Sequence, residues 1–405
     1  MFLYYIRKMS DISPTLLCKQ IVNERIQNQE AVYNFGLGEN PITQPSYFID
    51  SVKHHAHQKS YTSCEGIPEL NQTLRNMYDT DDTSYEILVG NGLKELLFVV
   101  QSAFDGTIIH ITPSWVSYKE QIDVLGKQDK LIEIETKMED GFKINHDVLI
   151  KTLDSLGNQP KIILFNNPNN PAGICFDNDE VECLARILQK YDCMVFADEI
   201  YLNLCMQSGH KSIAEYIPDL TIRGSSVSKD LACGGYRLGW LAFPRKLDTF
   251  FNKCRLFASQ IYSCSASPIQ YATNDILQNT EVYNHHVKNT VNTFSGIFDE
   301  LIPVLDETRL CFVKPDAAWY LFVDFENYRT YFESLGVHDS IDLSTHLLSK
   351  FGIVTVAAQH FQHNSFSLRF SLVDFTFDFE NGSSVDISHM KKGFCILRDY
   401  LTTFV

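Results

Sequence analysis

Several features that mark particular protein classes are missing from this sequence of 405 residues. No apolar run approaches the roughly 20 residues of a membrane-spanning helix, which argues against an integral membrane protein. We find no internal repeat and no low-complexity tract, so neither a solenoid nor a disordered chain is expected. Basic residues are few: 34 Lys and Arg stand against 50 Asp and Glu, for a net charge of −16. This balance argues against a surface that coats nucleic acid, and a small anionic ligand would need a local basic pocket.

Cysteines are present, but they lack the spacing of a disulfide framework or a zinc site. The eleven cysteines are scattered, none forms a Cys-x-x-Cys pair, and an odd number cannot all be paired. Most stand among apolar residues, where a thiol behaves as a small hydrophobic group. We therefore expect reduced thiols in an intracellular, cytoplasmic protein, and no bound metal.

The first residues, MFLYYIRKMSDIS, begin with an apolar stretch that Arg7 and Lys8 interrupt. That stretch is too short for the apolar region of a secretion signal, and no small-residue cleavage site follows it. Met9 is an alternative start to Met1, and the sequence leaves this choice open.

The composition is that of a globular chain with a large core, with 44% apolar, 12% aromatic and 21% charged residues. The length fits one large two-part domain or two domains of ordinary size. From about residue 86 onward, short apolar runs such as EILVG, KIILF and MVFAD alternate with helical stretches. After KIILF, Asp177 and Glu180 have the spacing of a capping box, which predicts a helix start. The alternation predicts an α/β fold with a mostly parallel sheet covered by helices.

The pattern changes after about residue 285. We expect a strand within VKPDAAWYLFVDF, a helix over DLSTHLLSKFG that ends at Gly352, and a half-buried strand over SFSLRFSL. Apolar residues then recur at helical spacing near the end of the chain, at Ile387, Met390, Phe394, Leu397 and Leu401. We predict a large domain over residues 45–285 and a smaller α/β domain from residues 1–44 and 286–405.

Polar residues gather where the predicted strands end. KIILF runs into NNPNNPAG, which contains Asn170, and MVFAD ends with Asp198 and is followed shortly by Tyr201. The stretch SSVSKDLACGGYRLGW adds Lys229, which taken alone would be a solvated charge. Because ligands bind beyond the carboxyl ends of the strands in an open parallel sheet, we expect these side chains to converge on one edge.

Pyridoxal phosphate is a ligand that needs this combination of groups. A lysine such as Lys229 binds its aldehyde as a Schiff base, and an aspartate such as Asp198 keeps its ring nitrogen protonated. Its phenolic oxygen suits an amide and a tyrosine hydroxyl, here Asn170 and Tyr201. Its phosphate suits hydroxyls, an arginine fork and the N–H groups of a helix start. The candidates for the phosphate are Ser226, Ser228 and Arg237 with the backbone of Leu93 and Lys94.

These motifs resemble those of the class I/II aminotransferases, which are fold-type I pyridoxal-phosphate enzymes. NNPNNPAG is similar to their Asn-Pro-x-Asn-Pro-x-Gly loop, ADEIY to Asp-Glu-x-Tyr, and SVSKDLACGGYRLGW to Ser-x-Ser-Lys followed by Gly-x-Arg-x-Gly. KSYTSCEGIPEL, TPSWVSY and SLRFSL resemble three further family segments. The motifs follow in the family's order, and the resemblance extends from Gly38 to Arg369, over most of the chain.

The resemblance implies roles for further residues. Trp115 would stack on the cofactor ring, although a tryptophan of the core would also fit the sequence. Arg369 would bind the α-carboxylate of the substrate, and a salt bridge on a strand surface is the alternative. Gly38 would bring its backbone close to the substrate, and Asn170 would lie there too. Tyr61 would reach the phosphate of a neighbouring subunit, which implies a homodimer with shared sites.

The predicted activity is an aminotransferase that moves an amino group between an L-amino acid and a 2-oxo acid, with Lys229 as general acid and base. C–S lyases and aminocyclopropane-carboxylate synthases share most of these residues and stay open as an alternative. A regulator built on an inactive aminotransferase fold is disfavoured, because we identify no helix-turn-helix before Gly38 and the catalytic positions are intact. The substrate side chain stays open. So does the way the pocket closes, because VTVAAQHFQHNSF lacks the Pro-Gly that usually precedes the arginine strand.

Overall fold

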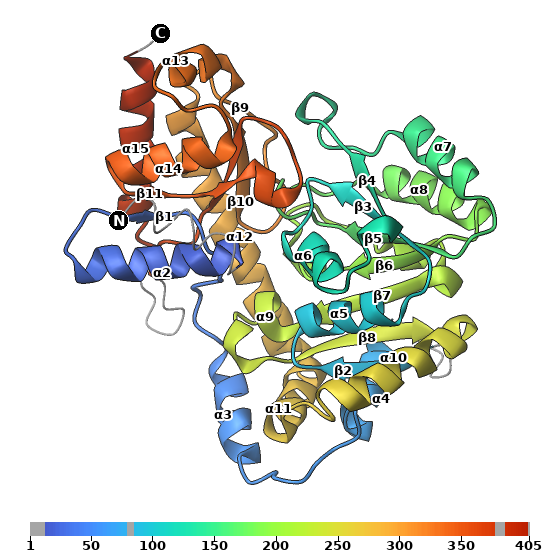
Figure 1. The fold of residues 1–405 in the computed structure, drawn as a ribbon. Coiled ribbons are helices and arrows are strands. Elements are labelled where there is room, and N and C mark those ends of the chain that lie inside the picture. Colours follow the sequence, from blue (N-terminus) through green and yellow to red (C-terminus); the bar gives the residue numbers. More distant parts are fainter. Residues whose placement is uncertain (1–12, 79–84, 377–384, 404–405) are drawn as a thin grey trace.

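The computed structural model describes residues 13–78, 85–376 and 385–403. The N-terminal segment with Met1 and Met9 lies outside the described residues. A seven-stranded sheet dominates the fold, in the order β2-β8-β7-β6-β5-β3-β4 (Figure 1). Its strands are β2 (Tyr85–Gly90), β3 (Thr107–Thr112), β4 (Leu131–Glu135), β5 (Lys161–Asn166), β6 (Met194–Asp198), β7 (Thr221–Ser226) and β8 (Gly239–Pro244). Only β8 runs against its neighbours β2 and β7 within this sheet, so the predicted mostly parallel sheet is confirmed.

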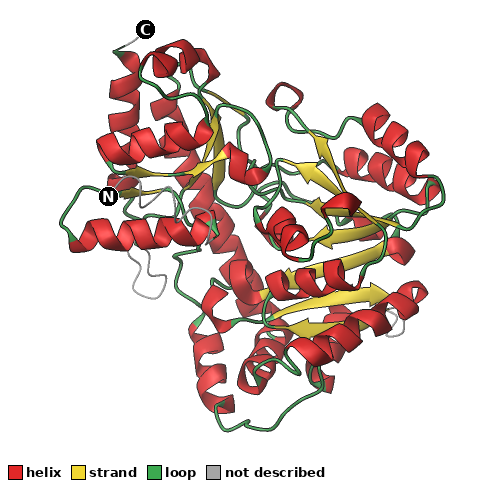
Figure 2. Cartoon of the chain, viewed as in Figure 1, coloured by secondary structure: helices red, strands yellow, loops and turns green. Residues whose placement is uncertain are grey.

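Alternate residues of the central strands enter different cores on the two faces of this sheet. In β5, Leu164 packs toward α5, α6 and α10, whereas Ile163 and Phe165 pack toward α7 and α8. Figure 2 shows the strands enclosed between helices. These helices are α5 (Leu93–Ala103), α6 (Ser117–Val124), α7 (His146–Leu156), α8 (Asn178–Lys190) and α10 (Asp248–Ile261). A strand that is buried on both faces needs apolar side chains at every position, and this explains the run KIILF.

Helix starts follow local sequence signals. The Asp177 side chain accepts a hydrogen bond from the Glu180 N–H, and the Glu180 side chain accepts one from the Asp177 N–H, so the predicted capping box opens α8. Three further helices pack beside the β2–β8 end of the sheet: α3 (Ser46–His55), α4 (Pro68–Tyr78) and α11 (Ser267–Gln278). The short helix α9 (Val227–Asp230) follows β7 directly.

A second, smaller sheet has the order β12-β13-β10-β9, and β1 pairs with β11 beside it. These strands are β1 (Tyr33–Asn34), β9 (Cys311–Phe312), β10 (Tyr320–Asp324), β11 (Ile353–Val354), β12 (Val356–Ala357) and β13 (Ser367–Ser371). The helices of this part are α2 (Pro14–Gln27), α13 (Arg329–Ser334), α14 (Ser340–Phe351) and α15 (Ser388–Thr402). The pairing of β1 with β11 brings the N-terminal segment onto the smaller part, as expected.

Helix α12 (Thr280–Leu305) connects the two parts as one continuous element of 26 residues. Its first turns contact α11 and α9, and its second half enters the core of the smaller part. The predicted domain boundary at residue 285 falls inside this helix, and the domain division stays a prediction. Neither α12 nor another helix of the described ranges has both the length and the apolar character that a bilayer span requires.

Two expectations for the C-terminal part are confirmed and one is wrong. α14 ends at Gly352, which has a left-handed φ of 74°. α15 buries the apolar residues that recur at helical spacing. The expectation of a half-buried strand at SLRFS is wrong, because all five residues of β13 are buried. Leu368 and Phe370 face the core. Of the polar alternate residues, Arg369 and Ser371 contact the backbone that follows β1, where Ser371 N–H donates to the Phe35 carbonyl over 2.8 Å, and Ser367 donates to the Asp324 side chain.

Candidate active site

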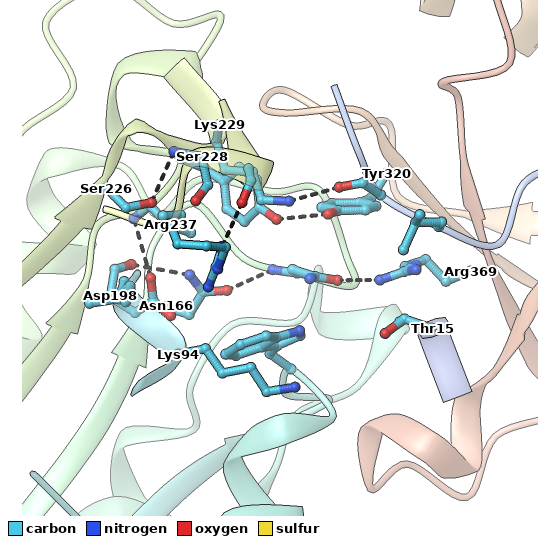
Figure 3. A pocket seen from close by; sticks show the side chains of 18 residues that line it. Thr15, Lys94, Asn166, Asp198, Ser226, Ser228, Lys229, Arg237, Tyr320 and Arg369 are labelled. Carbon is cyan, nitrogen blue, oxygen red and sulfur yellow. Dashed lines mark hydrogen bonds between the residues drawn. The ribbon is translucent and has the colours of Figure 1, made fainter. Parts of the chain in front are cut away.

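A cavity of about 230 Å³ lies where strands of the large sheet end and the smaller part begins. Asn166, Asp198 and Ser226, the last residues of β5, β6 and β7, line one side. Tyr320 and Arg369 from the smaller sheet line another side, as Figure 3 shows. The cavity wall includes every residue that the sequence singled out, with the exception of Tyr61.

Lys229 reaches into this cavity from α9. Its Nζ donates a hydrogen bond to the Gly38 carbonyl over 2.7 Å and lies 5.7 Å from the centre of the Tyr201 ring. The backbone carbonyl of Lys229 accepts a hydrogen bond from the Asn40 side chain over 3.1 Å. A Cβ on Gly38 would collide with the Tyr320 hydroxyl, so this close approach requires glycine. The amine therefore stands between the two parts of the molecule.

Asp198 is a buried carboxylate at the end of β6, with an exposed fraction of 3%. The Tyr118 hydroxyl donates to Asp198 Oδ2 over 2.6 Å, and the Ile200 N–H donates to Oδ1 over 3.2 Å. Burial raises the pKa of Asp198 to about 6 despite these donors. No described cation forms an ion pair with this carboxylate. It is therefore suited to a ligand that brings its own positive charge.

Arg369 is 1% exposed, and its guanidinium is held by neutral acceptors. Nη1 donates to Asn170 Oδ1 over 3.0 Å, and Nη2 donates to the Gly36 carbonyl over 2.6 Å. Nε has no partner among the described residues. Burial lowers the pKa of Arg369. The alternative of a surface salt bridge is wrong, because the side chain is buried and no described carboxylate pairs with it.

An anion cradle lies at the start of α5. Gly92 has a φ of 94°, and a Cβ on Gly239 would lie 2.6 Å from the backbone nitrogen of Leu93. Only glycine leaves this helix start open, and the first N–H groups of a helix have no acceptor within it. Arg237 extends beside it and donates to the Asn91 carbonyl over 3.0 Å. Ser226, Ser228 and Lys94 line the same wall.

These groups fit pyridoxal phosphate as a set. The cradle can take a dianionic phosphate, Asp198 can face a protonated ring nitrogen, and the Lys229 amine can meet the aldehyde. Trp115 is partly buried and lines the cavity, while its other contacts belong to the cores beside β3 and α6. Its position is therefore compatible with both interpretations from the sequence, a residue that stacks on the cofactor ring and a tryptophan of the core.

Tyr61 is the predicted site residue that the cavity does not include. Its exposed fraction is 93%, and it lies in the loop between α3 and α4. The neighbouring Ser60 carbonyl accepts a hydrogen bond from Ser267 over 2.6 Å, which anchors the loop to α11. Nothing within the described chain covers the Tyr61 ring.

Sequence reasoning missed three polar side chains that line this cavity, and Tyr118, which bonds to one of the lining residues. Tyr118 bonds to Asp198, and it stands three residues after Trp115 within the quoted TPSWVSY segment. The hydroxyl of Tyr320 lies 2.7 Å from that of Tyr201. Asn166 and Thr15 also line the cavity. Tyr118 and Asn166 lie in or beside a recognised motif, so pattern reasoning could have found them. Tyr320 and Thr15 could not be assigned this way.

The segment without Pro-Gly, VTVAAQHFQHNSF, contacts the large part through backbone and side-chain hydrogen bonds. The Phe361 carbonyl accepts from the Ser114 N–H over 3.0 Å, and Ser114 Oγ donates to the Gln362 side chain over 2.7 Å. The Nε2 atom of His363 lies 3.0 Å from the Thr136 carbonyl oxygen. The Phe361 ring lies 5.0 Å from the Arg369 guanidinium. Ser114 and Thr136 thus join this segment to the large part, and the Phe361 ring packs beside the Arg369 side chain of the smaller part.

Comparison with known proteins agrees with this geometry. Residues 31–375 match the family described as aminotransferase class I and II. Because the match covers most of the chain, the protein belongs to this family. It is a fold-type I, pyridoxal-phosphate-dependent aminotransferase that acts on amino acids and 2-oxo acids.

Similar proteins come from several prokaryotes. The chain is 26% identical over 364 residues to the probable aspartate/prephenate aminotransferase of Aquifex aeolicus, covering 86% of this chain and 89% of the relative. It is 29% identical over 311 residues to the aspartate aminotransferase of Bacillus sp. strain YM-2, covering 72% and 76%. A structure of the Thermus thermophilus aspartate aminotransferase with maleate has a TM-score of 0.83 at 22% identity, covering 98% and 99% of the two chains. At that identity the structural likeness shows a shared fold.

Proposed function

We propose that this aminotransferase acts on a dicarboxylic L-amino acid such as aspartate or glutamate. Four cationic side chains line the described cavity: Lys94, Lys229, Arg237 and Arg369. In the proposed arrangement, three of them have partners in the cofactor aldehyde, the cofactor phosphate and the substrate α-carboxylate. Lys94 is left over, and this observation carries the proposal. A second carboxylate on the substrate would pair with it.

The surroundings of Lys94 support this assignment. Its Nζ lies 5.5 Å from the centre of the Trp115 ring and makes no ion pair within the described ranges. Burial lowers the pKa of Lys94 more than the nearby Glu120 carboxylate raises it, so its ammonium gains from an added anion. Thr15 lines the same cavity and can donate a hydroxyl. Relatives named aspartate aminotransferases fit a dicarboxylic substrate.

The cofactor would be held by the residues named from the sequence. Lys229 would bind the aldehyde covalently, Asp198 would face the ring nitrogen, and Asn170 and Tyr201 would donate to the phenolic oxygen. Trp115 would cover the ring face. The phosphate would be bound by Ser226, Ser228, Arg237 and the N–H groups of Leu93 and Lys94. When bound, pyridoxal phosphate supplies an electron-withdrawing ring that makes the α-hydrogen of an amino acid acidic.

The chain's own groups would then orient the substrate and move its proton. Arg369 would grip the α-carboxylate, with its buried Nε gaining an acceptor. The Gly38 backbone would border the substrate. Lys229 Nζ would accept the proton from the substrate α-carbon and return it later in the reaction. Asn170, which already bonds Arg369, would fix that guanidinium toward the substrate.

The substrate proposal can be tested with Lys94→Gln, which keeps the helix backbone and removes the charge. We expect kcat/KM for aspartate to fall about 10- to 30-fold, because one charge-assisted contact is worth roughly 2 kcal/mol. For alanine or phenylalanine the change should stay below about twofold. The measurement is the single-turnover half-reaction, followed by cofactor absorbance, with each amino acid.

Lys119→Gln is the matched control, because Lys119 is on nearby α6 and pairs with Asp123 over 2.7 Å at the surface. It should leave all half-reactions unchanged. An equal loss in Lys94→Gln on every amino acid would contradict the second-carboxylate role. Release of ammonia with the oxo acid would instead indicate the lyase or synthase alternative.

We further propose a cytoplasmic homodimer, with Tyr61 of one subunit at the phosphate site of the other. The near-complete exposure of the Tyr61 ring supports a partner at this position. The eleven cysteines, all free, support a reducing compartment. We also propose the division into a large domain, 45–285, and a smaller domain, 1–44 with 286–405. The separate sheets support this division.

A further inference from the structure

A cluster of two thiols and one imidazole lies beside the cavity without lining it. The Sγ atoms of Cys175 and Cys205 are 2.7 Å apart. The ligand atoms of these cysteines and of His210 all lie within 4.8 Å of one another. Cys175 follows the NNPNNPAG loop after β5, and Cys205 follows η3 (Leu202–Leu204), the short helix after β6. This pair could not be predicted from the sequence, because thirty positions separate its members.

The two thiols differ in access and in acidity. Cys175 is 3% exposed, whereas Cys205 is partly exposed. The Cys175 S–H donates to the Cys205 sulfur, and this contact lowers the pKa of Cys205. Burial lowers the pKa of His210, which makes its imidazole a weaker base, and its Nε2 lies 3.4 Å from the Asn167 side-chain nitrogen. An accessible, more acidic thiol is the one that reacts first with an oxidant, and a buried neighbour can then join it.

A metal site fits these atoms less well than a sulfur–sulfur bond. Tetrahedral zinc holds two thiolates at about 2.3 Å each, which separates their sulfurs by roughly 3.7 Å. The Cys175 and Cys205 sulfurs are closer than that. The nearby Asp316 carboxylate accepts from the Cys175 N–H over 2.6 Å and from the Gln207 side chain over 2.5 Å. Both of its oxygens already accept a hydrogen bond, and the group of possible ligand atoms that lie close together consists of the two thiols and the imidazole alone among the described residues.

We propose that Cys175 and Cys205 form a reversible disulfide when the protein meets a hydroperoxide. The Cys205 thiolate attacks a peroxide oxygen, the O–O bond breaks, and Cys205 becomes a sulfenic acid as water or an alcohol leaves. The Cys175 sulfur then attacks the Cys205 sulfur, the S–S bond forms and the S–O bond breaks. Hydroxide leaves as water with a proton from the thiols. In total two thiols lose two electrons and two protons, and one hydroperoxide is reduced.

The surrounding backbone already holds the two loops together. The Asp316 N–H donates to the Gly173 carbonyl over 3.0 Å, and the Ala318 N–H donates to the Leu204 carbonyl over 3.0 Å. One segment thus bridges the loop before Cys175 and the helix before Cys205. A bond between the sulfurs needs little backbone movement. It would connect the loop of Asn170 covalently to the segment after Tyr201.

The experiment treats the holoenzyme with one equivalent of hydrogen peroxide and maps its peptides without reduction. We expect one cross-linked pair that contains Cys175 and Cys205, the loss of two titratable thiols, and full reversal by dithiothreitol. The thermal midpoint should rise by about 3 to 5 °C, because the bond restrains the unfolded chain. Cys175→Ser should remove the cross-link and the rise in midpoint. If that variant does not fold, Cys205→Ser serves in its place.

Cys183→Ser is the matched control. Cys183 is exposed and lies 3.5 Å from His146 Nδ1, so it shares the imidazole neighbour but has no second thiol. This variant should form the cross-link as the wild type does. Sulfinic acid at Cys205 without a cross-link would overturn the proposal. So would one equivalent of zinc that the purified wild type retains and Cys175→Ser loses, with no cross-link formed.

Discussion

The proposed cofactor end and the proposed substrate end of the cavity differ in how completely their polar groups are satisfied. At the cofactor end, Asp198 accepts from Tyr118 and from a backbone N–H, and Arg237 donates to two backbone carbonyls. At the proposed substrate end, Arg369 Nε has no partner in the described chain, and Lys94 Nζ lies over the Trp115 ring without an ion pair among the described residues. Protein contacts fix the first set in place before any ligand binds. The second set keeps binding capacity for a ligand that enters and leaves at every turnover.

Lys229→Ala should have the largest effect, because in the proposed arrangement this amine both binds the cofactor and moves the substrate proton. We expect turnover to fall by about 10³-fold or more, since the proton acceptor and the covalent link are both lost. Pyridoxal phosphate should still bind non-covalently, because Asp198 and Arg237 remain. Borohydride reduction of the wild type, followed by peptide mapping, should label Lys229. A label on a different lysine would show that the assignment is wrong.

Asp198→Asn tests the cofactor end next. A neutral amide cannot hold a ring nitrogen protonated, so we expect the cofactor to stay bound while turnover falls about 10²- to 10³-fold. Tyr118→Phe is the control, because it removes one hydrogen-bond donor and keeps the carboxylate. Its turnover should fall about tenfold or less. Turnover of Asp198→Asn near the wild-type rate would contradict the proposed role.

The same substitution has a pH signature in the cofactor-free protein. Burial raises the pKa of Asp198 from 3.8 to about 6, so the folded state binds its proton more tightly than the unfolded state. The tighter proton binding stabilises the folded state by about 3 kcal/mol at low pH, and this stabilisation is lost as the pH rises through 6. Urea unfolding should therefore show Asp198→Asn gaining stability relative to wild type between pH 4.5 and 7. A difference that does not change with pH would contradict this.

Arg369→Lys tests the substrate end with a smaller change. The charge is kept, but the two-donor fork is lost, so kcat/KM should fall about 30-fold for one lost charge-assisted hydrogen bond. Cofactor affinity should not change, which separates the substrate end from the cofactor end. Equilibrium dialysis of the cofactor and half-reaction kinetics measure the two quantities. A parallel loss of cofactor affinity would show that the two ends are not independent.

Tyr61→Phe should have the smallest effect, a roughly tenfold weaker cofactor affinity with unchanged carboxylate recognition. If Tyr61 acts across subunits, a heterodimer of Tyr61→Phe and Lys229→Ala subunits has one site with both defects and one site with neither. Co-expressed, separately tagged subunits should then show one cofactor site of normal affinity and activity. The cross-subunit role fails if weak binding always belongs to the subunit that carries Tyr61→Phe.

Much of the cofactor end could be predicted from the sequence, because its groups lie in short segments that directly follow strands. Asn170, Asp198 and Lys229 each stand within four residues of the end of a strand. In a parallel sheet those ends meet at one edge, so local patterns were enough to place them together. The helix start at Gly92 also comes directly after the end of a strand, β2, so it could be placed at the same edge of the sheet.

The substrate end depended on contacts between distant segments. Arg369 could be named from its motif, but its burial was not predictable, because the backbone after β1 and the Phe361 segment cover it. Only the tertiary structure identifies three further site residues, the Lys94 side chain, Thr15 and Tyr320, because only there do α5, α2 and β10 border one cavity. The Cys175–Cys205 pair depends in the same way on two loops that Asp316 and Ala318 hold together. The sequence by itself determined the strands, their alternation with helices and the cofactor motifs. These features depend on local periodicity and on the residues at strand ends. Only the tertiary structure decided which side chains remain without partners in the cavity, because that depends on packing between segments far apart in the chain.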